Sequence, residues 1–126
     1  YVPLNTRVTF DETKHLARAM AQMLEKEDPQ RITSKMRKDH RHGRIFVDWS
    51  QNDDHKTTVC AYSLRARERP TVSTPVTWDE LETAYRRKDS DRLVFTCDDV
   101  LKRVEKLGDI FEPVLKLKQK QPRPED

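Results

Sequence analysis

Glycine is scarce in this chain of 126 residues, which contains only Gly43 and Gly108. Phosphate-binding loops of the dinucleotide and Walker types need several glycines, because their backbone amides approach the phosphates closely. The sequence therefore excludes both kinds of loop. Any phosphate that this protein binds must be held by side chains.

Cysteines and long apolar runs are also few. Cys60 and Cys97 are far apart in the sequence, which excludes a CxxC redox pair and a zinc ribbon. No stretch of about 18 apolar residues occurs, and no apolar segment typical of an export signal opens the chain. We therefore expect a cytoplasmic protein with reduced thiols and no membrane partner.

Charge is abundant by contrast, since 37% of the residues are charged and 34% are hydrophobic. A chain of this length forms one ordinary domain with a modest core. Six lysines or arginines and a single acid, Asp39, lie between Arg31 and Arg44. Such a cluster is typical of a nucleic-acid contact or, alternatively, of a solvated surface.

Helix-start signals recur along the chain. Thr9 and Glu12 form a capping box, in which a hydroxyl and a carboxylate satisfy the first helical amides. Apolar residues at helical spacing then predict a helix over 10–27, which Pro29 ends. Further helices are predicted over part of 34–39, after Thr77, after Thr96 or Asp98 as far as Gly108, and after Ile110.

Strand signals predict an α+β fold. Residues 45–49 alternate between two faces, turn-forming residues follow, and 56–62 read as the return strand of a β-hairpin. Residues 71–76 read as an edge strand or irregular extended segment, and 93–96 as a brief strand. We expect one sheet with helices packed against it. The opening residues 1–4 read as the end of a strand, which suggests that the chain was cut from a longer protein.

Asp48 is the most informative residue because it is predicted in the middle of a strand, where aspartate is disfavoured. One interpretation is an aspartate at the sheet edge paired with an arginine. The other is a carboxylate that binds a divalent cation among side chains that hold phosphates. Trp49 and Trp78 are interpreted as core residues rather than as platforms for stacking bases.

Three segments together resemble a known family: GRIFVDWSQN (43–52), KTT with AYSLRAR (56–67) and TPVTWDEL (74–81). Their order and spacing resemble the primase-polymerase domains of bacterial end-joining repair, found in the multifunctional ATP-dependent DNA ligase D and in stand-alone relatives. The resemblance implies that 1–117 form the C-terminal part of that domain and 118–126 a polar tail or linker. It further implies an RRM-like antiparallel sheet with packed helices, within an archaeo-eukaryotic-primase-like fold.

The resemblance also implies a nucleotidyl-transfer site. Asp48 would be a catalytic carboxylate and a ligand of Mn²⁺ or Mg²⁺, since hard ions of this kind prefer carboxylate oxygens. Arg65 would grip the triphosphate of an NTP or dNTP, and Arg41 and Gln51 would lie near the incoming nucleotide or the template. Charge alone adds four candidate DNA contacts: Lys35, Arg37, Lys38 and Arg67.

The family's Asp-x-Asp pair and catalytic histidine precede the motif that contains Asp48, and this chain has no such pair there. Asp89-Ser90-Asp91 lies downstream and is interpreted as a solvated turn. A zinc site built on His40 and His42 is disfavoured, because arginines beside it would repel the ion. The chain alone is therefore expected to lack polymerase activity.

Three functions remain open at this stage. The first is part of a template-dependent DNA/RNA primase-polymerase that acts on ends, gaps and primer-templates in double-strand-break repair, near the nucleoid, with a ligase domain and an end-binding protein as partners. The second is a non-catalytic nucleic-acid-binding module. The third is a structural subdomain that supports a ligase.

Overall fold

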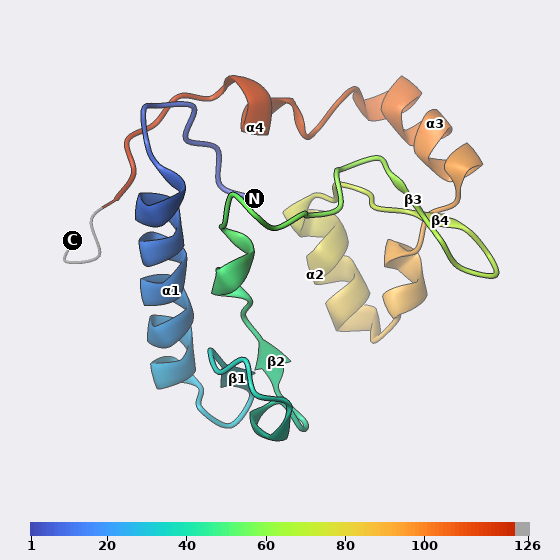
Figure 1. Ribbon diagram of the computed structural model, residues 1–126. Helices are drawn as coiled ribbons and strands as arrows, with labels where there is room; N and C mark the ends of the chain where they lie inside the picture. Colours follow the sequence, from blue (N-terminus) through green and yellow to red (C-terminus); the bar gives the residue numbers. More distant parts are fainter. Residues whose placement is uncertain (123–126) are drawn as a thin grey trace. The chain divides into compact units, whose positions relative to one another are not determined.

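The computed structural model describes residues 1–122, which form two compact units (Figure 1). The first, here called the α1 unit, comprises residues 6–58 and the described residues from 118 onwards. The second, the α3 unit, comprises residues 1–5 and 59–117. The α1 unit contains α1 (Phe10–Glu27), β1 (Ile32–Thr33), η1 (Lys38–His40), β2 (Ile45–Phe46) and η2 (Trp49–Gln51). The α3 unit contains β3 (Leu64–Arg65), β4 (Thr71–Val72), α2 (Trp78–Arg87), η3 (Ser90–Leu93), α3 (Cys97–Leu107) and α4 (Glu112–Lys116).

Helix α1 begins at the predicted capping box. The Thr9 hydroxyl accepts the amide hydrogen of Glu12 at 3.2 Å, and the Glu12 carboxylate accepts that of Thr9 at 2.7 Å. The helix ends at Glu27, two residues before Pro29. Ala21 is fully buried, because its small side chain lets the rest of the unit approach the helix closely. The predicted helix is thus confirmed from end to end.

The predicted hairpin is wrong. Strand β2 pairs in parallel with β1, with Ile32 opposite Ile45 and Thr33 opposite Phe46, and residues 56–62 contain no strand. Asp48 is the physical reason, because its side chain accepts the backbone amide of Ser50 and turns the chain into η2. A short polar side chain that binds a nearby amide competes in this way with a strand.

The α3 unit combines an antiparallel strand pair with capped helices. Strands β3 and β4 pair with Leu64 opposite Val72. Thr77 begins α2 as predicted, and of the two predicted caps for α3 it is Thr96 that begins the helix; both starts are capping boxes. The predicted strand over 93–96 is wrong, because η3 extends to Leu93. The Val72 amide of β4 donates a hydrogen bond to the Phe95 carbonyl at 2.9 Å, which joins that segment to β4 without a strand.

Helix α2 carries its aromatic residues on the outside. The prediction that Trp78 belongs to the core is wrong, since 83% of its surface is exposed, and Tyr85 on the same helix is 82% exposed. Ala84 is the residue that α2 buries. The apolar core of this unit therefore depends on small and medium side chains, Val72 and Val100 among them.

An ion pair joins α2 to α3. The Arg103 guanidinium donates to both carboxylate oxygens of Glu80 and to the Pro75 carbonyl at 3.2 Å. Its central carbon lies 5.1 Å from the centre of the Phe95 ring. Only 11% of the Arg103 side chain is exposed, against 33% of Glu80. The hydrogen bonds from Arg103 outweigh the opposing effect of burial and lower the pKa of Glu80 to about 2.

This pair is expected to make stability depend on pH in the acid range. Because the pKa of Glu80 falls from 4.5 to about 2 on folding, its contribution is complete above pH 4.5 and is lost as the pH falls towards 2. Since the carboxylate is one-third exposed, screening limits the loss to about 1–2 kcal/mol. Urea unfolding followed by circular dichroism between pH 6 and 2 measures it.

Glu80→Gln is the control, because a glutamine at this position can still cap the helix but cannot ionise. The difference in unfolding free energy between the two proteins should shrink as the pH falls. A constant difference across that range would contradict the assignment.

Candidate functional site

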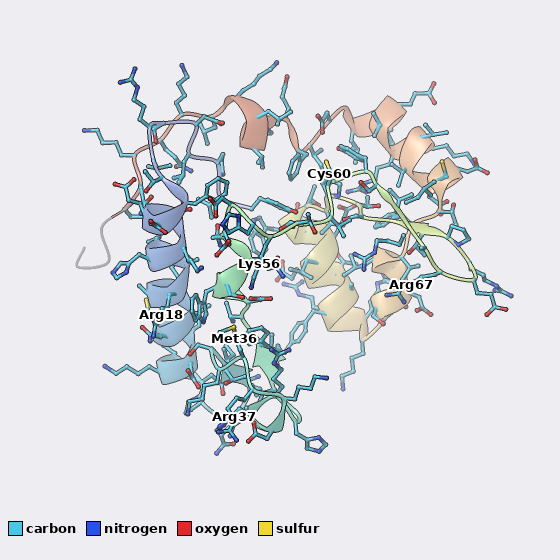
Figure 2. The ribbon with its side chains drawn as sticks, viewed as in Figure 1. Arg18, Met36, Arg37, Lys56, Cys60 and Arg67 are labelled. Atoms are coloured by element: carbon cyan, nitrogen blue, oxygen red, sulfur yellow. The ribbon has the colours of Figure 1, made fainter. Side chains whose placement is uncertain are left out.

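Asp48 lies where β2 ends and η2 begins, and two neighbouring side chains hold it. One carboxylate oxygen accepts the Ser50 hydroxyl at 2.6 Å, and the other accepts the Gln51 amide at 3.2 Å. The Lys56 ammonium, labelled in Figure 2, donates to the Ser50 oxygen at 2.8 Å. Asp48 and Gln51, both predicted to be site residues, are therefore in direct contact.

The carboxylate of Asp48 is exposed and ionised. Burial raises its pKa, but the hydrogen bonds from Ser50 and Gln51 and the charge of Lys56 outweigh that effect, so the pKa lies below its usual value of 3.8. Among the described residues Asp48 has no arginine partner. The interpretation of Asp48 as half of an arginine ion pair is wrong for this structure.

Arg41 lies at the end of η1, in the same unit as Asp48. Its guanidinium carbon sits 4.0 Å from the centre of the Phe46 ring, and one of its terminal nitrogens donates to the Met36 carbonyl. Its Nε is buried and has no hydrogen-bond partner within residues 1–122. A buried donor without a partner is costly, so one donor of the Arg41 guanidinium is left unsatisfied by the described residues.

The candidate DNA contacts of the α1 unit lie together in sequence and are exposed. Lys35 and Arg37 lie in the segment between β1 and η1, and Lys38 is the first residue of η1. Arg37 is partly neutralised, because it donates twice to Asp39, at 2.7 and 3.2 Å. The cationic character of this segment thus depends mainly on Lys35 and Lys38.

The other two predicted cations belong to the α3 unit. Arg65 ends β3, opposite Thr71 of β4, and Arg67 lies in the turn between these strands. Both side chains are exposed, and neither has an ion-pair partner in the described part of the chain. They are free to meet an anion.

The side chains present do not by themselves form a two-metal centre. Within residues 1–122, no three histidine, cysteine, aspartate or glutamate side chains come together to hold a metal ion. Asp53, the next acid after Asp48, is paired with Lys14, which lowers the pKa of Asp53 to about 2. One carboxylate is too few for a pair of divalent ions, each of which takes several oxygen ligands.

The Asp89-Ser90-Asp91 segment and the two cysteines do not contribute to the candidate site. Asp89 pairs with Arg92 at 3.1 Å at the start of η3, and Asp91 is exposed, as expected of a solvated turn. Cys60 and Cys97 are exposed free thiols. Within the described chain, no helix is both long and apolar enough to cross a bilayer.

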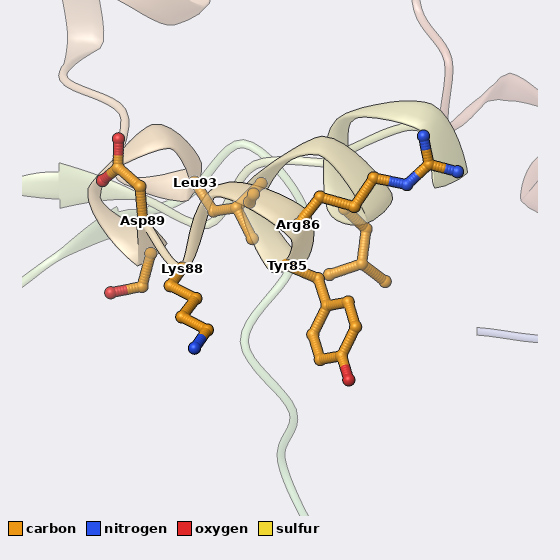
Figure 3. A pocket seen from close by; sticks show the side chains of 8 residues that line it. Tyr85, Arg86, Lys88, Asp89 and Leu93 are labelled. Carbon is orange, nitrogen blue, oxygen red and sulfur yellow. The ribbon is translucent and has the colours of Figure 1, made fainter.

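A hollow of about 520 Å³ lies against α2 and η3 in the α3 unit. Figure 3 shows Tyr85 extending away from the helix, with Lys88 and Asp89 on the turn that follows. Leu93 supplies part of its apolar wall. None of the predicted site residues lines this hollow, so the chemistry around Asp48 does not extend to it.

Sequence reasoning missed two members of the arrangement around Asp48. Ser50 is buried and links Asp48 to Lys56. The signal was available, because a serine two residues after an aspartate is typical of an aspartate that caps a turn. Arg18 of α1, whose guanidinium carbon lies 5.0 Å from the centre of the Trp49 ring, gave no signal, since its position on the helix also fits a solvated face.

The fold and this arrangement define a class: mixed helix-and-sheet proteins with an ionised carboxylate held by serine and glutamine side chains, with a lysine beside the serine. Comparison with known proteins identifies the family. Residues 1–111 match the model of the LigD primase-polymerase domain, and the chain belongs to that family.

Curated relatives and a solved structure agree with this assignment. The multifunctional non-homologous end joining protein LigD of Mycolicibacterium smegmatis is 43% identical over 114 residues, which are 90% of this chain and 14% of that protein. The bifunctional LigD of Bacillus subtilis is 29% identical over 109 residues, or 86% of this chain and 17% of that protein. The polymerase domain of Mycobacterium tuberculosis ligase D, solved in complex with DNA, matches with a TM-score of 0.80 and 39% identity.

These matches cover most of this chain but a much smaller part of each related protein. The match to the solved polymerase domain covers 93% of this chain but 39% of that domain. The chain spans about one-seventh of the length of the mycobacterial relatives. The larger proteins therefore contain much that this sequence does not.

Proposed function

We propose that this chain is part of a template-dependent DNA/RNA primase-polymerase that adds nucleotides at DNA ends and gaps during double-strand-break repair. The observation that carries the proposal is the match of nearly the whole chain to a polymerase domain that was solved with DNA. In this proposal the short strand pairs belong to a larger RRM-like sheet of the archaeo-eukaryotic primase type. A ligase domain and an end-binding protein are the proposed partners.

Asp48 is the proposed catalytic carboxylate. It is exposed, ionised and held in one orientation by Ser50 and Gln51. In the complete enzyme it would be one of several ligands of Mn²⁺ or Mg²⁺, with the others supplied from outside this sequence. Because the described residues alone do not form such a centre, this chain by itself is expected to add no nucleotides.

Three further side chains have proposed roles towards the nucleotide. Arg65 binds the triphosphate, which suits an exposed guanidinium with no ion-pair partner in the described chain. Arg41 keeps an unsatisfied buried Nε for an acceptor on the nucleotide or the template, and Gln51 orients Asp48. Side chains do this work because the chain lacks a glycine-rich loop.

Primer extension by the complete protein that contains this chain tests the proposal. A template-primer pair, Mn²⁺ and labelled nucleoside triphosphates should give an extended primer with the complete protein and none with the 126-residue chain. Absence of extension by the complete protein would overturn the proposal.

In the same assay, Arg65→Ala should raise the apparent Michaelis constant for the nucleotide about 10-fold or more and change the maximal rate less. The physical reason is that a charge-assisted hydrogen bond to phosphate contributes about 1.5–3 kcal/mol. Arg69→Ala is the matched control, because Arg69 is an exposed arginine of the same turn region. An unchanged constant in Arg65→Ala, or an equal change in both variants, would contradict triphosphate binding by Arg65.

A second function, that of a non-catalytic nucleic-acid-binding module, is favoured by one observation: the described residues contain no group of three or more histidine, cysteine, aspartate or glutamate side chains that could hold a metal ion. In that case DNA would bind the complete protein, and no extension would occur at any metal concentration.

A further inference from the structure

A second hollow lies in the α1 unit, between α1 and the segment that follows β1. Its volume is about 430 Å³, within the range of about 300–1,000 Å³ usual for small-ligand sites. The lining includes Arg18 of helix α1, Lys35 and Met36 of the segment, and Trp49 of η2. Figure 2 shows Arg18 on α1, and Met36 on the chain beside that helix.

The charge of this hollow favours an anion. Within residues 1–122, neither Arg18 nor Lys35 has an ion-pair partner. The one carboxylate of the lining, that of Glu25, accepts the hydroxyls of Ser34 and Thr33 at its two oxygens. Arg18 and Lys35 therefore lie in the lining without a close ion pair to any described residue, although the Ser34 hydrogen bond and the charge of Lys35 both lower the pKa of Glu25.

The same hollow also has an apolar side. Met36 is 49% exposed although its thioether is hydrophobic. The Trp49 ring is fixed in place, because its Nε1 donates to the Ser34 carbonyl at 3.0 Å and Arg18 lies over the ring. Sites for single strands combine cations, which hold the phosphates, with aromatic surface for the bases, and here Trp49 supplies the ring and Met36 the exposed apolar side chain next to it in the lining.

The position of the hollow favours a nucleic-acid strand over a free nucleotide. Trp49 directly follows Asp48 in the sequence, and the cationic segment leads from Lys35 through Lys38 to Arg41. A strand whose nucleotide occupies the hollow has further cations along the same segment for its next phosphates.

We propose that this hollow holds one nucleotide of single-stranded DNA, with its phosphate between Arg18 and Lys35 and its base against Met36. The inference rests on the proposed function, because the strand would be the DNA on which the polymerase acts. It adds a site on helix α1 to the contacts expected from charge alone.

Binding of a fluorescent single-stranded oligothymidylate to the 126-residue chain, followed by anisotropy at several salt concentrations, tests the phosphate contacts. The double variant Arg18→Ala/Lys35→Ala should bind about 10-fold or more weakly and should lower the salt slope by about 0.7, because one phosphate contact on a single strand is lost. Lys26→Ala removes one charge from the same helix outside the hollow and should change the affinity less than 2-fold.

The single variant Lys35→Ala keeps the test independent of folding, because the Lys35 side chain is exposed and makes no hydrogen bond or ion pair in the described structure. It should reduce the affinity, and it should lower the salt slope by no more than about 0.7, the value for one phosphate contact. If Lys26→Ala weakens binding as much as Lys35→Ala, general charge attraction explains the binding and the proposal is overturned.

Met36→Ala tests the base contact. It should weaken binding of the oligothymidylate several-fold and leave binding of an abasic strand of the same length unchanged, because only the base meets Met36. Equal losses on both strands would overturn the assignment of the base.

Primer extension by the complete protein separates the two proposals. If the wild type extends a primer but the variants of Arg18, Lys35 and Met36 bind DNA as well as the wild type, the nucleotide site in the hollow is refuted and the polymerase function stands. If those variants bind DNA more weakly but the complete protein never extends a primer, the nucleotide site stands and the polymerase function is refuted.

Discussion

Replacing Asp48 by alanine in the complete protein is expected to lower the rate of nucleotide addition at least about 1,000-fold, which corresponds to roughly 4 kcal/mol of transition-state stabilisation. Asp48 is the exposed, ionised carboxylate at the centre of the candidate site, and its loss removes a metal ligand in the proposed mechanism. Affinity for a template-primer should change less than about threefold, since phosphate contacts by lysine and arginine dominate DNA binding. Single-turnover primer extension and anisotropy measure the two quantities.

Asp48→Asn separates chemistry from local structure. Asparagine keeps an oxygen that can accept the Ser50 amide and hydroxyl, so η2 retains its cap, but it lacks the charge. Both variants should therefore be inactive. Substantial activity in Asp48→Asn with loss only in Asp48→Ala would show that the residue serves as a helix cap rather than as a metal ligand.

Arg103→Ala is expected to lower the free energy of unfolding by about 2–4 kcal/mol, since breaking a buried ion pair leaves its partner without compensation. Arg103 satisfies both oxygens of Glu80 and the Pro75 carbonyl, and it packs over Phe95. Urea denaturation at pH 7 measures the change.

Arg92→Ala provides the matched comparison. Arg92 also forms an ion pair, with Asp89 at 3.1 Å, but nearly half of each side chain is exposed. Exposed pairs contribute about 0–1 kcal/mol, so this variant should lose less than about 1 kcal/mol. An equal loss of unfolding free energy in the two variants would mean that burial does not strengthen the contribution of the Arg103 ion pair to stability.

Helices were predictable from the sequence because their signals are local. The capping boxes at Thr9, Thr77 and Thr96 each begin a helix, and the residues that make a box are only three positions apart. Gly108 ends α3 with φ of 71°, a conformation that glycine adopts without strain.

Strands were not predictable in the same way. Each strand of the structure is two residues long, so its existence depends on a partner distant in the sequence. The alternation at 45–49 favoured a longer strand, but the Asp48 side chain diverted the chain after Phe46. The strand propensity of these residues was outweighed by one local hydrogen bond, from the Ser50 amide to the Asp48 side chain.

The candidate site was predictable in part. Asp48 and Gln51 belong to one motif and do lie together. Arg65 and Arg67 belong to the other compact unit, and their roles stay predictions. Arg18 was not identified, because nothing in a helical pattern distinguishes a cation that covers a tryptophan from one that faces water.

The short helix η2 has a consequence for engineering this protein. Asp48 precedes its first residue, Trp49 is that residue, and Ser50, buried at 6% exposure, anchors the turn. A substitution that tilts this turn would displace the carboxylate and the indole in concert. Attempts to change the environment of the Asp48 carboxylate without moving Trp49 should therefore begin at Lys56, which lies outside η2 and donates to the Ser50 hydroxyl oxygen.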